Sequence, residues 1–592
     1  MPLQANPSGA SVVHGNVAFN GLGTSQLNIV QGSQNAIINW QSFSIQNGEV
    51  TNFIQPSQNS MALNRVTGAD PSAIYGSLNA NGGVIVINPN GIVVGPGGRV
   101  DVAGMLTMST LDMENEDFLD GGPMRFRGET SAGIRNYGAI SSASGDVVLL
   151  GNFLQNSGKV SAATGTVAFG AGGDIVVNQT ASGGKISVLA GGVGGENGIE
   201  NTATGEINGA AAELKAHGNV YALAIKNDGV VRANGYNFSG GRLTLSGGSG
   251  SSVINTGGLY AGNSNGSGGR VEISGGNVSL AAGTIDASGV GATSGGTVAV
   301  TGDSVNVGNG AVIDVSGATA GSVSLTGVSA AAVDGALSAA GRSGVGGSID
   351  VTAESVLVGS NAVVDVSGTA QGGSARLGGG FQGGEADIDN AESVVVEEGS
   401  LLLADSSEGD AGRIVVWADN DTTYEGEISA RSYGQVGNGG FVEVSGKNDL
   451  YFNGLVSTLS ANGANGTLLL DPTDVVIGDV GSATVTLVDT ALIAALGGGN
   501  VVIHTSSAGT DDGNITVERG ADLTTGYASA SSLALFAEGD IIINDDIQNS
   551  GAGNITLFAG WDGTGVGNFA AQPAISFSDI ADANNAAVTY GD

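Results

Sequence analysis

Hydrophobic and polar residues alternate along short segments of this chain, and these segments recur at a near-constant distance. Five of them begin with glycine, carry the strands GRVEIS, GTVAVT, GSVSLT, GSIDVT and GSARLG, and start at Gly269, Gly296, Gly321, Gly347 and Gly373. Successive starts lie 27, 25, 26 and 26 residues apart. Strict alternation predicts a β-strand with one buried and one exposed face.

Two further short runs recur in step with the first. One reads IDASG, IDVSG, LSAAG and VDVSG, and the other includes residues 304–307 and 355–358. Each repeat of about 26 residues therefore holds three short strands separated by Gly, Asn or Ser turns. Three strands with no returning helix predict an all-β fold, a parallel β-helix or solenoid, with one coil per repeat and a continuous core. A β-propeller is excluded, because its blades need about 40–50 residues each.

The pattern is less regular elsewhere. Segments from Gly145, Gly165 and Gly173 are of the same strand type, whereas the acid-rich residues 112–129 predict an external loop or hairpin. Residues 487–496 lack alternation and precede three glycines, which indicates a short inserted helix before strands resume. We expect a first domain over 1–250, regular coils over 251–470 and a further β-rich segment over 471–592. Strands continue to the last residues without a polar cap, so we expect this segment to be truncated.

Composition and charge narrow the function. Glycine accounts for 106 of 592 residues, whereas charged residues make up 12 %, about half of the usual ~25 %. The formal net charge is −37, and a surface this acidic repels nucleic acid and anionic lipid. No apolar run of about 18 residues occurs, so we expect no transmembrane helix and no stable membrane insertion.

The chain contains no cysteine, which excludes thiolate catalysis, Cys-ligated zinc and a disulfide scaffold. This fits a protein that crosses an oxidising compartment unfolded. The first residues show neither a basic n-region nor an apolar h-region. We expect the signal peptide to be absent from this chain because it has been removed.

The first ~120 residues resemble a known family. Residues 62–109, ALNRVTGADPSAIYGSLNANGGVIVINPNGIVVGPGGRVDVAGMLTMS, are similar to the haemagglutination-activity domain of two-partner secretion exoproteins (TpsA), which include filamentous haemagglutinin and the high-molecular-weight adhesins. A second similarity lies downstream, in GGFVEVSGK (439–447) and GTLLLDPTDVVIG (466–478). The two occur in the order found in the family and together cover about a quarter of the chain.

The resemblance implies a mechanism. In this family the POTRA domains of a dedicated outer-membrane β-barrel (TpsB) recognise the N-terminal domain in the periplasm, and the unfolded chain passes through the barrel. It then folds outside as a right-handed β-helix. We therefore expect a monomer without cofactor, secreted or held at the surface of a Gram-negative-type bacterium. The resemblance assigns transporter recognition to a motif and to two residues upstream of it: Asn88, Pro89, Asn90, Gly91, Ile92, Asn64 and Arg65.

The residues of the motif have a local interpretation of their own. Pro89 fixes φ, and the Asn90-Gly91 pair favours a tight turn between an apolar strand over 84–87 and another over 92–94. We expect the side chain of Asn88 to cap this corner. A turn needed only for folding and a part of the partner-recognition surface are both open interpretations, and they are compatible.

Residue patterns for catalysis or metal binding are sparse. The three histidines, His14, His217 and His504, have no metal-ligand spacing, and we predict no catalytic site. Asp286, Asp314 and Asp365 occupy the same place in three coils, with Ser338 in the coil between. Stacked carboxylates repel unless they are screened or bridged by a cation. A solvated row, a weak calcium site and a carboxylate pair for glycan cleavage are all open.

The sequence favours the N-terminal portion of a large secreted adhesin that attaches to a cell or another surface. The trunk of a contact-dependent toxin carrier or haemolysin is one alternative, and a β-helix enzyme acting on polysaccharide is another. The receptor or glycan, on a host or a bacterium, is unknown from the sequence.

Overall fold

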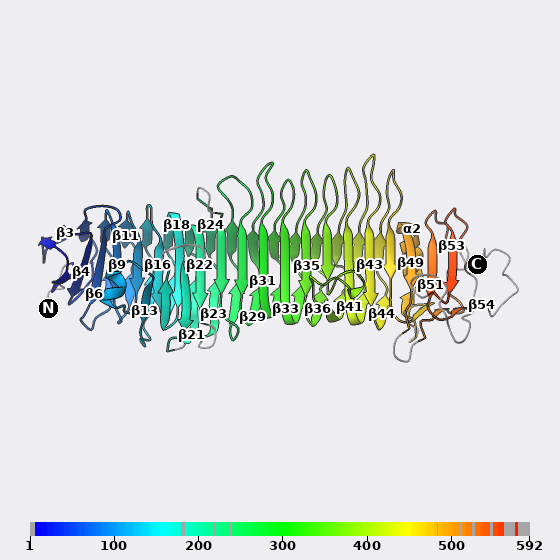
Figure 1. The fold of residues 1–592 in the computed structure, drawn as a ribbon, viewed down its shortest axis with the longest axis horizontal. Helices are drawn as coiled ribbons and strands as arrows, with labels where there is room; N and C mark the ends of the chain where they lie inside the picture. The colour runs from blue at the N-terminus through cyan, green and yellow to red at the C-terminus, as the bar shows by residue number, and fades with distance from the viewer. Residues whose placement is uncertain are drawn as a thin grey trace. The chain divides into compact units, whose positions relative to one another are not determined.

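A computed structural model describes residues 6–577, apart from 179–183, 194, 218–220, 237–239, 482–483, 508–511, 522, 524–526, 545–546, 548 and 562–574. The chain divides into two compact units. The first comprises residues 1–287 and 297–303, and the second comprises 288–296 and 304–592. Both consist mainly of short strands that pair in parallel with the strands of neighbouring coils (Figure 1). The predicted all-β, parallel β-helical fold is confirmed.

In the first unit the coils contribute strands to three parallel faces. The first face contains β3 (Gln26–Gln31), β5 (Val50–Ile54), β8 (Ser77–Ala80), β11 (Arg99–Val102), β15 (Ala139–Ser142), β18 (Lys159–Ala171), β22 (Glu206–Ala216), β24 (Val230–Ala233), β27 (Gly258–Ala261) and β30 (Gly283–Asp286). The second face contains β4 (Asn35–Trp40), β6 (Met61–Val66), β9 (Gly83–Ile87), β12 (Leu106–Ser109), β16 (Val147–Gly151), the later parts of β18 and β22, β25 (Arg242–Ser246), β28 (Arg270–Ser274) and β31 (Thr297–Val307). The third face contains β7 (Ser72–Ile74), β10 (Ile92–Val94), β14 (Ile134–Asn136), β17 (Leu154–Asn156), β21 (Gly195–Asn201), β23 (Tyr221–Asn227), β26 (Ser252–Asn255) and β29 (Asn277–Leu280).

The core of the first unit is a set of stacked apolar rows. One inward row of the first face is at most 2 % exposed and consists of Leu78, Val100, Ile140, Val160, Ile207, Val231, Leu259 and Ile285. Burying each such side chain contributes roughly 1.5–3 kcal/mol. At the N-terminal end, β1 (Ser11–His14) and β2 (Val17–Asn20) pair antiparallel with β4 and β3 and satisfy backbone groups of the first coil.

The third face carries a buried row of asparagines. The side-chain amide of Asn136 donates to Asn156, Asn156 to Asn201, Asn201 to Asn227 and Asn227 to Asn255, over 2.7–2.8 Å. All five residues are at most 1 % exposed. Each amide is both donor and acceptor, so the row satisfies polar groups that would otherwise be unpaired in the core.

A small layer of structure covers the outward side of the second face. It contains α1 (Asn115–Leu119) and an antiparallel sheet of β13 (Met124–Arg127), β19 (Asp174–Val177) and β20 (Ile186–Ala190). Residues 112–129, for which an external loop or hairpin is predicted, do leave the solenoid, but they form α1 and a strand, β13, that pairs with β19. The prediction that the segment from Gly173 is a solenoid strand is wrong, because it forms β19 of this extra sheet. Beneath this layer, the solenoid strands β9 and β16 are buried on both sides. The alternation of apolar and polar residues therefore could not distinguish a solenoid strand from a strand of the extra sheet.

The second unit repeats the three faces. Its first face contains β32 (Ala311–Asp314), β34 (Ala336–Ser338), β37 (Val363–Asp365), β40 (Leu401–Leu403), β42 (Glu427–Ser429) and β45 (Leu455–Ser457). The second contains β33 (Ser322–Val333), β35 (Ser348–Thr352), β38 (Ser374–Leu377), β41 (Arg413–Tyr424), β43 (Phe441–Gly446), β46 (Thr467–Leu470), β49 (Asn500–His504), β51 (Leu533–Ala537) and β53 (Ile555–Ala559). The third contains the later parts of β33 and β41, with β36 (Ser355–Val358), β39 (Ala391–Val396), β44 (Asp449–Phe452), β47 (Val475–Gly478), β48 (Leu487–Val488), β50 (Ile515–Val517), β52 (Ile541–Ile543) and β54 (Ile575–Phe577).

Short helical segments interrupt the strands of the second unit. The helix α2 (Asp489–Gly498) confirms the insertion predicted near 487–496, and strands resume after it as expected. The 3-10 turn η3 (Phe381–Gly383) lies in the connection between β38 and β39.

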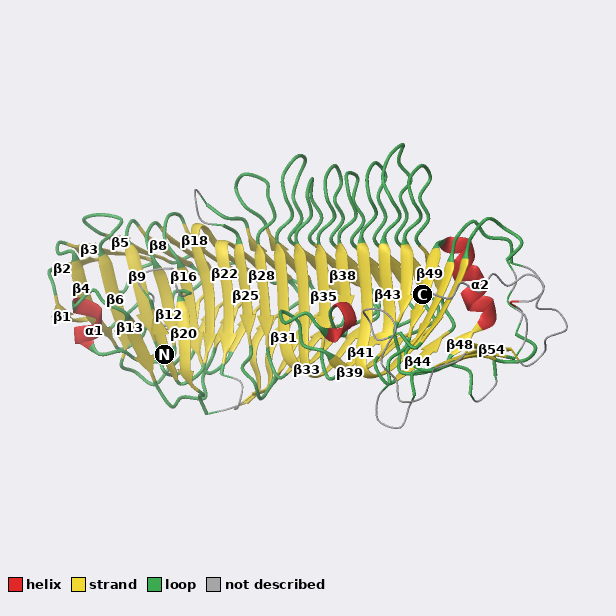
Figure 2. Cartoon of the chain, turned by 45° about the vertical axis from the view of Figure 1, so that its right-hand side comes forward, coloured by secondary structure: helices red, strands yellow, loops and turns green. Residues whose placement is uncertain are grey.

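Glycine-rich arms project from the second unit between its first and second faces (Figure 2). They span residues 288–296, 316–321, 339–347, 366–373, 404–412, 430–440 and 458–466. Neighbouring arms pair through their backbones, as in Ser406 with Ser432 and Ser432 with Ser460. The backbones of neighbouring arms, here called limbs, approach each other closely, so that a Cβ atom on Gly439 would lie 1.7 Å from the Thr458 carbonyl oxygen of the next arm. The paired glycines are therefore required by close backbone packing.

Candidate functional site

The predicted corner at Asn88–Ile92 forms as expected between β9 and β10. Asn88 is fully buried, and its Oδ1 accepts hydrogen bonds from the backbone N–H (3.0 Å) and the side-chain amide (3.1 Å) of Asn90. Gly91 has a φ of +113°, a conformation that side chains rarely adopt. Ile92 is buried, whereas Pro89 and Asn90 are exposed at the tip. Asn88 therefore caps the corner from inside and presents Pro89 and Asn90 to solvent.

The corner is also fastened to neighbouring segments. The Asn88 side-chain amide donates to the Asp70 carbonyl and to Ser72 Oγ, each at 3.0 Å, and the Asn90 amide donates to the Gly68 carbonyl at 2.9 Å. On the other side, Thr130 Oγ1 donates to the Pro89 carbonyl at 2.6 Å. The corner is thus continuous with the base of the 112–129 excursion.

Asn64 and Arg65, the two upstream residues assigned with the motif, point in opposite directions. Asn64 is fully buried and accepts a hydrogen bond from Trp40 Nε1 at 3.0 Å. Arg65 pairs with Ile87 in the next coil, directly before the corner, and points outward into the excursion. Its Nε lies 2.8 Å from Asp112, its Nη1 donates to Asn115 and its Nη2 donates to the Met113 carbonyl. Asn64 therefore stabilises the core, and Arg65 anchors the excursion.

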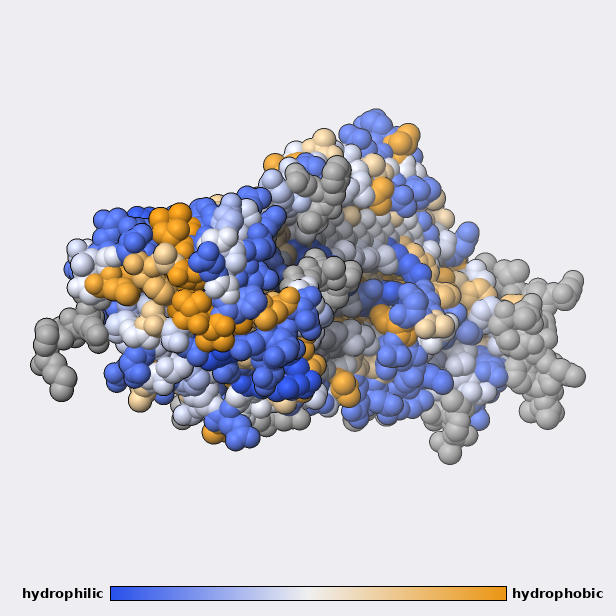
Figure 3. All heavy atoms as spheres, turned by 60° about the vertical axis from the view of Figure 1, so that its left-hand side comes forward, coloured by the Kyte–Doolittle hydropathy of each residue, from blue (hydrophilic) through white to orange (hydrophobic). Residues whose placement is uncertain are grey.

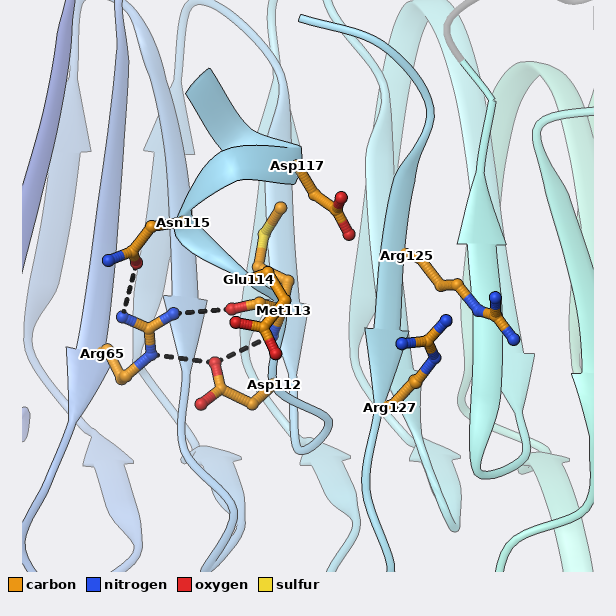
Figure 4. A pocket seen from close by; sticks show the side chains of 8 residues that line it. All are labelled: Arg65, Asp112, Met113, Glu114, Asn115, Asp117, Arg125 and Arg127. Carbon is orange, nitrogen blue, oxygen red and sulfur yellow. Dashed lines mark hydrogen bonds and ion pairs between the residues drawn. The ribbon is translucent and has the colours of Figure 1, made fainter. Parts of the chain in front are cut away.

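A polar pocket of about 370 Å³ lies between the Arg65 anchor and the extra sheet (Figure 4). Its charged lining contains three arginines and three acids: Arg65, Arg125, Arg127, Asp112, Glu114 and Asp117. Figure 4 shows Arg125 and Arg127 across the pocket from Arg65, with Asp117 projecting from α1 between the two groups. The pocket therefore offers both signs of charge to a polar protein surface rather than a single charge to a small ion.

The arginines on the far side of the pocket are held by one carboxylate. Arg125 donates to Asp174 through Nε (2.7 Å) and Nη2, and Arg127 lies 3.6 Å from the same carboxylate. The hydrogen bond from Arg125 keeps the pKa of Asp174 below its ordinary value. Arg125, Arg127 and Asp174 were not predicted as site residues, and their local sequence has no motif that would identify them.

The predicted aspartate row has local partners in the second unit. Asp314 and Asp365 each accept a hydrogen bond from the backbone N–H two residues later, at Ser316 and Ser367, over 2.8 Å. Ser338 lies between them in register, and Arg342 lies 3.7 Å from Asp314. Asp286 lies at the end of β30 in the first unit. Cation binding at these carboxylates stays a prediction, which calcium titration during thermal melting tests.

The described residues contain no group of three or more His, Asp or Glu side chains arranged to hold a metal ion. Among these same residues, no helix is both long and apolar enough to cross a membrane. Hydrophobic side chains reach the surface as patches among hydrophilic ones (Figure 3). In the first unit they include Val13, Leu22, Ile54, Tyr75 and Tyr137, each between 40 % and 50 % exposed.

Comparison with known proteins defines the class of the N-terminal part of this chain. Residues 3–259 match the family model of the TPS secretion domain. The chain therefore carries the secretion domain of the two-partner secretion exoproteins, and the recognition of this family from the sequence is confirmed. The matched family is a secretion domain rather than an enzyme family. TPS domains are exported through the outer membrane by a TpsB partner.

Among curated proteins, the chain is similar to two heme/hemopexin-binding proteins of Haemophilus influenzae. One is 41 % identical over 108 residues and the other 39 % over 108 residues. Each match covers 18 % of this chain and 12 % of the relative, so the chain spans only a small part of their length.

Two solved structures are also similar. The crystal structure of the HMW1 secretion domain from Haemophilus influenzae is 25 % identical, covers 77 % of this chain and 99 % of its own, and has a TM-score of 0.38. The filamentous hemagglutinin secretion domain is 17 % identical, covers 52 % and 97 %, and has a TM-score of 0.34. The fold assignment rests on the strand pairing described above.

Proposed function

We propose that this chain is the N-terminal portion of a large secreted adhesin, and that its partner's POTRA domains recognise the surface formed by the Asn88–Ile92 corner and the Arg65-anchored excursion. The match of residues 3–259 to the TPS secretion domain carries the export part of this proposal. The β-helical second unit then serves as a rod-like stalk for attachment to a cell or another surface.

Geometry supports the corner and excursion as one recognition surface. Pro89 and Asn90 are exposed at the corner, and Thr130 joins the corner to the excursion through a 2.6 Å hydrogen bond. Arg65 fixes the other end of the excursion beside the charged pocket. The corner and the excursion therefore offer a partner one continuous surface.

The exported portion could instead carry a toxin, bind haem or cleave polysaccharide, and the comparisons bear on each of these roles differently. A toxin carrier or haemolysin would share this secretion domain, so the choice depends on a passenger function that the export assay does not measure. The heme/hemopexin-binding relatives match over only 12 % of their length, which gives no argument for haem or hemopexin binding by this chain. A polysaccharide-active enzyme finds no support in the matched family.

Replacing the exposed asparagine of the corner tests the recognition surface. Asn90→Ala removes the hydrogen bonds to Gly68 and Asn88, which together contribute about 1–3 kcal/mol. We expect the variant to reach the medium in several-fold lower amount than the wild type when a signal peptide and the cognate outer-membrane transporter are supplied.

Asn79→Ala is the matched control, because Asn79 lies on the first face and also donates one side-chain hydrogen bond, to Asn52 at 2.9 Å. It should be secreted at the wild-type level. Equal secretion of Asn90→Ala and the wild type would contradict the role of the corner in recognition. Because both proteins would still be exported, that result would not contradict the assignment of the secretion domain.

A further inference from the structure

A glycine-rich segment crosses the outward side of the second face in the second unit. Residues 378–390, here called the strap, leave the β-helix after β38 and rejoin it at β39. Phe381 packs edge-on against Phe441, with ring centroids 5.7 Å apart, and Arg413 lies against both rings at 5.1 and 5.8 Å. At the end of the strap, Asn390 donates to Asp419, which also accepts from Trp417 Nε1. The strap therefore spans strands of several coils.

Gln382 fixes the centre of the strap. Its φ of +48° is unusual for a residue other than glycine, so its position depends on its contacts. Its backbone N–H lies 3.1 and 3.2 Å from the two carboxyl oxygens of Glu443, and its side-chain amide donates to Asp471 at 2.6 Å. One residue thus connects the strap to two acids on neighbouring coils.

The two acids come from the second pair of similar sequence segments, GGFVEVSGK and GTLLLDPTDVVIG. The fold places them together because Glu443 pairs with Leu469, and Asp471 follows two residues later on the same side of the strand. The backbone N–H of Asp471 donates to Ser445 Oγ at 3.0 Å. Neither Glu443 nor Asp471 belongs to the recognition surface proposed for the Asn88–Ile92 corner and the excursion.

Glu443 is buried without a cationic partner within ion-pair distance in the described residues. It is 0 % exposed, and burial raises its pKa to about 8; the hydrogen bond from the Gln382 N–H and the charge of Arg413 oppose this rise in part, and the negative charge of Asp471 adds to it. Asp471 itself is paired with His504 at 3.0 Å. On neighbouring elements Arg413 pairs with Glu385, and Arg376 pairs with Asp350, Glu385 and Asp387. Arg413 Nε and Nη2 are buried without a hydrogen-bond partner in the described residues, and Asp419 accepts hydrogen bonds from Asn390 and Trp417.

We infer that Glu443, Asp471 and Gln382 form a protonation-dependent clamp, which holds the strap closed while Glu443 carries a proton and releases it when Glu443 is ionised. Ionisation of Glu443 places a second negative charge beside Asp471 in a buried site. The strap contains no strand, so it can leave without breaking a strand ladder and is expected to yield first.

The sign of the pH dependence follows from the two states. In the open state Glu443 faces water and titrates near its ordinary value of about 4.3. In the closed state its pKa is about 8. Below the pKa of the open state, Glu443 is protonated in both states and the strap is closed. Between the two values the equilibrium constant for opening rises by up to about tenfold per pH unit, and above the second it is constant.

Release of the strap would uncover a surface of defined chemistry. Trp417 is 4 % exposed and lies against Gly379 and Gly383 of the strap. Phe441 and the carboxyl of Glu443 lie under the same segment on β43, where they contact Phe381 and Gln382. Opening would therefore expose aromatic rings and carboxylates on the outward side of β41, β43 and the segment after β46.

Hydrogen exchange of the strap in the full chain tests the clamp. The protection factor of peptides covering 378–390, corrected for the intrinsic exchange rate, should fall steeply between pH 5 and pH 8 in the wild type. Glu443→Gln keeps the shape and the acceptor oxygen but cannot ionise, so its strap should stay protected across this range. Glu392→Gln changes an exposed glutamate next to the strap on β39 and should behave as the wild type.

Two results would overturn the inference: strap protection in the wild type that does not change with pH, or the same pH dependence in Glu443→Gln as in the wild type. If Glu443→Gln fails to fold, Asp471→Asn provides the second readout, because removing the neighbouring charge should move the loss of protection to lower pH. An unchanged midpoint in Asp471→Asn would also contradict the clamp.

Discussion

Asn201 lies in the middle of the buried amide row of the first unit and both donates to Asn227 and accepts from Asn156. The row is possible because successive coils place the same residue type at the same inward position. Four of its members precede a glycine by two residues, in NYG, NSG, NDG and NTG. That local pattern is a sequence signal for the row.

Replacing Asn201 should destabilise the first unit. Asn201→Ala leaves one amide and one carbonyl of the neighbouring asparagines without a partner in the core, and each unsatisfied group costs about 1–3 kcal/mol. Urea unfolding should show the loss. Asn208→Ala, on the half-buried outward side of the same coil, should change stability by about 0.5 kcal/mol or less. Equal effects of the two variants would show that the row adds nothing beyond surface asparagines.

Local contacts were predictable at the residue scale, and distant ones were not. Asn88 caps a backbone group two residues away, so the sequence suffices to expect it. Arg65 contacts residues 47 to 50 positions later, and Gln382 contacts acids 61 and 89 positions later. Such partners depend on which coil lies above which, and a single sequence does not give that register.

At the scale of elements, the coils could be predicted from the sequence where their spacing is regular. Coils of the second unit recur at about 26 residues because each has three strands and one arm. In the first unit the asparagine row advances by 20 residues from Asn136 to Asn156 but by 45 from Asn156 to Asn201, because β19 and β20 are inserted between them. The insertion removes the period, although the coils themselves are intact.

The arms provide a prediction of their own. Gly439→Ala would place a Cβ atom 1.7 Å from the Thr458 carbonyl oxygen, so the two limbs must separate. We expect a loss of about 1–3 kcal/mol in the stability of the second unit, measured by chemical unfolding. Gly497→Ala is the control, since a Cβ atom there meets no heavy atom within 4 Å. If both variants are as stable as the wild type, close packing of the limbs does not explain the glycines.

At the scale of the whole molecule, the sequence predicted the fold and the family, and the domain boundaries at 250 and 470 stay predictions. The family was recognisable because the Asn88–Ile92 corner is a compact local motif, and the fold because coils repeat. The strap was not predictable, since GGGFQGG has the composition of an ordinary turn and acquires its position only through Glu443 and Asp471.

The central claim is that this chain is exported by a dedicated outer-membrane partner. The most direct measurement is the amount of the full chain, fitted with a signal peptide, that reaches the medium with and without its cognate TpsB-type transporter. The account predicts release into the medium only when the transporter is present. Retention in the periplasm despite a functional cognate transporter, or equal release without it, would contradict the account.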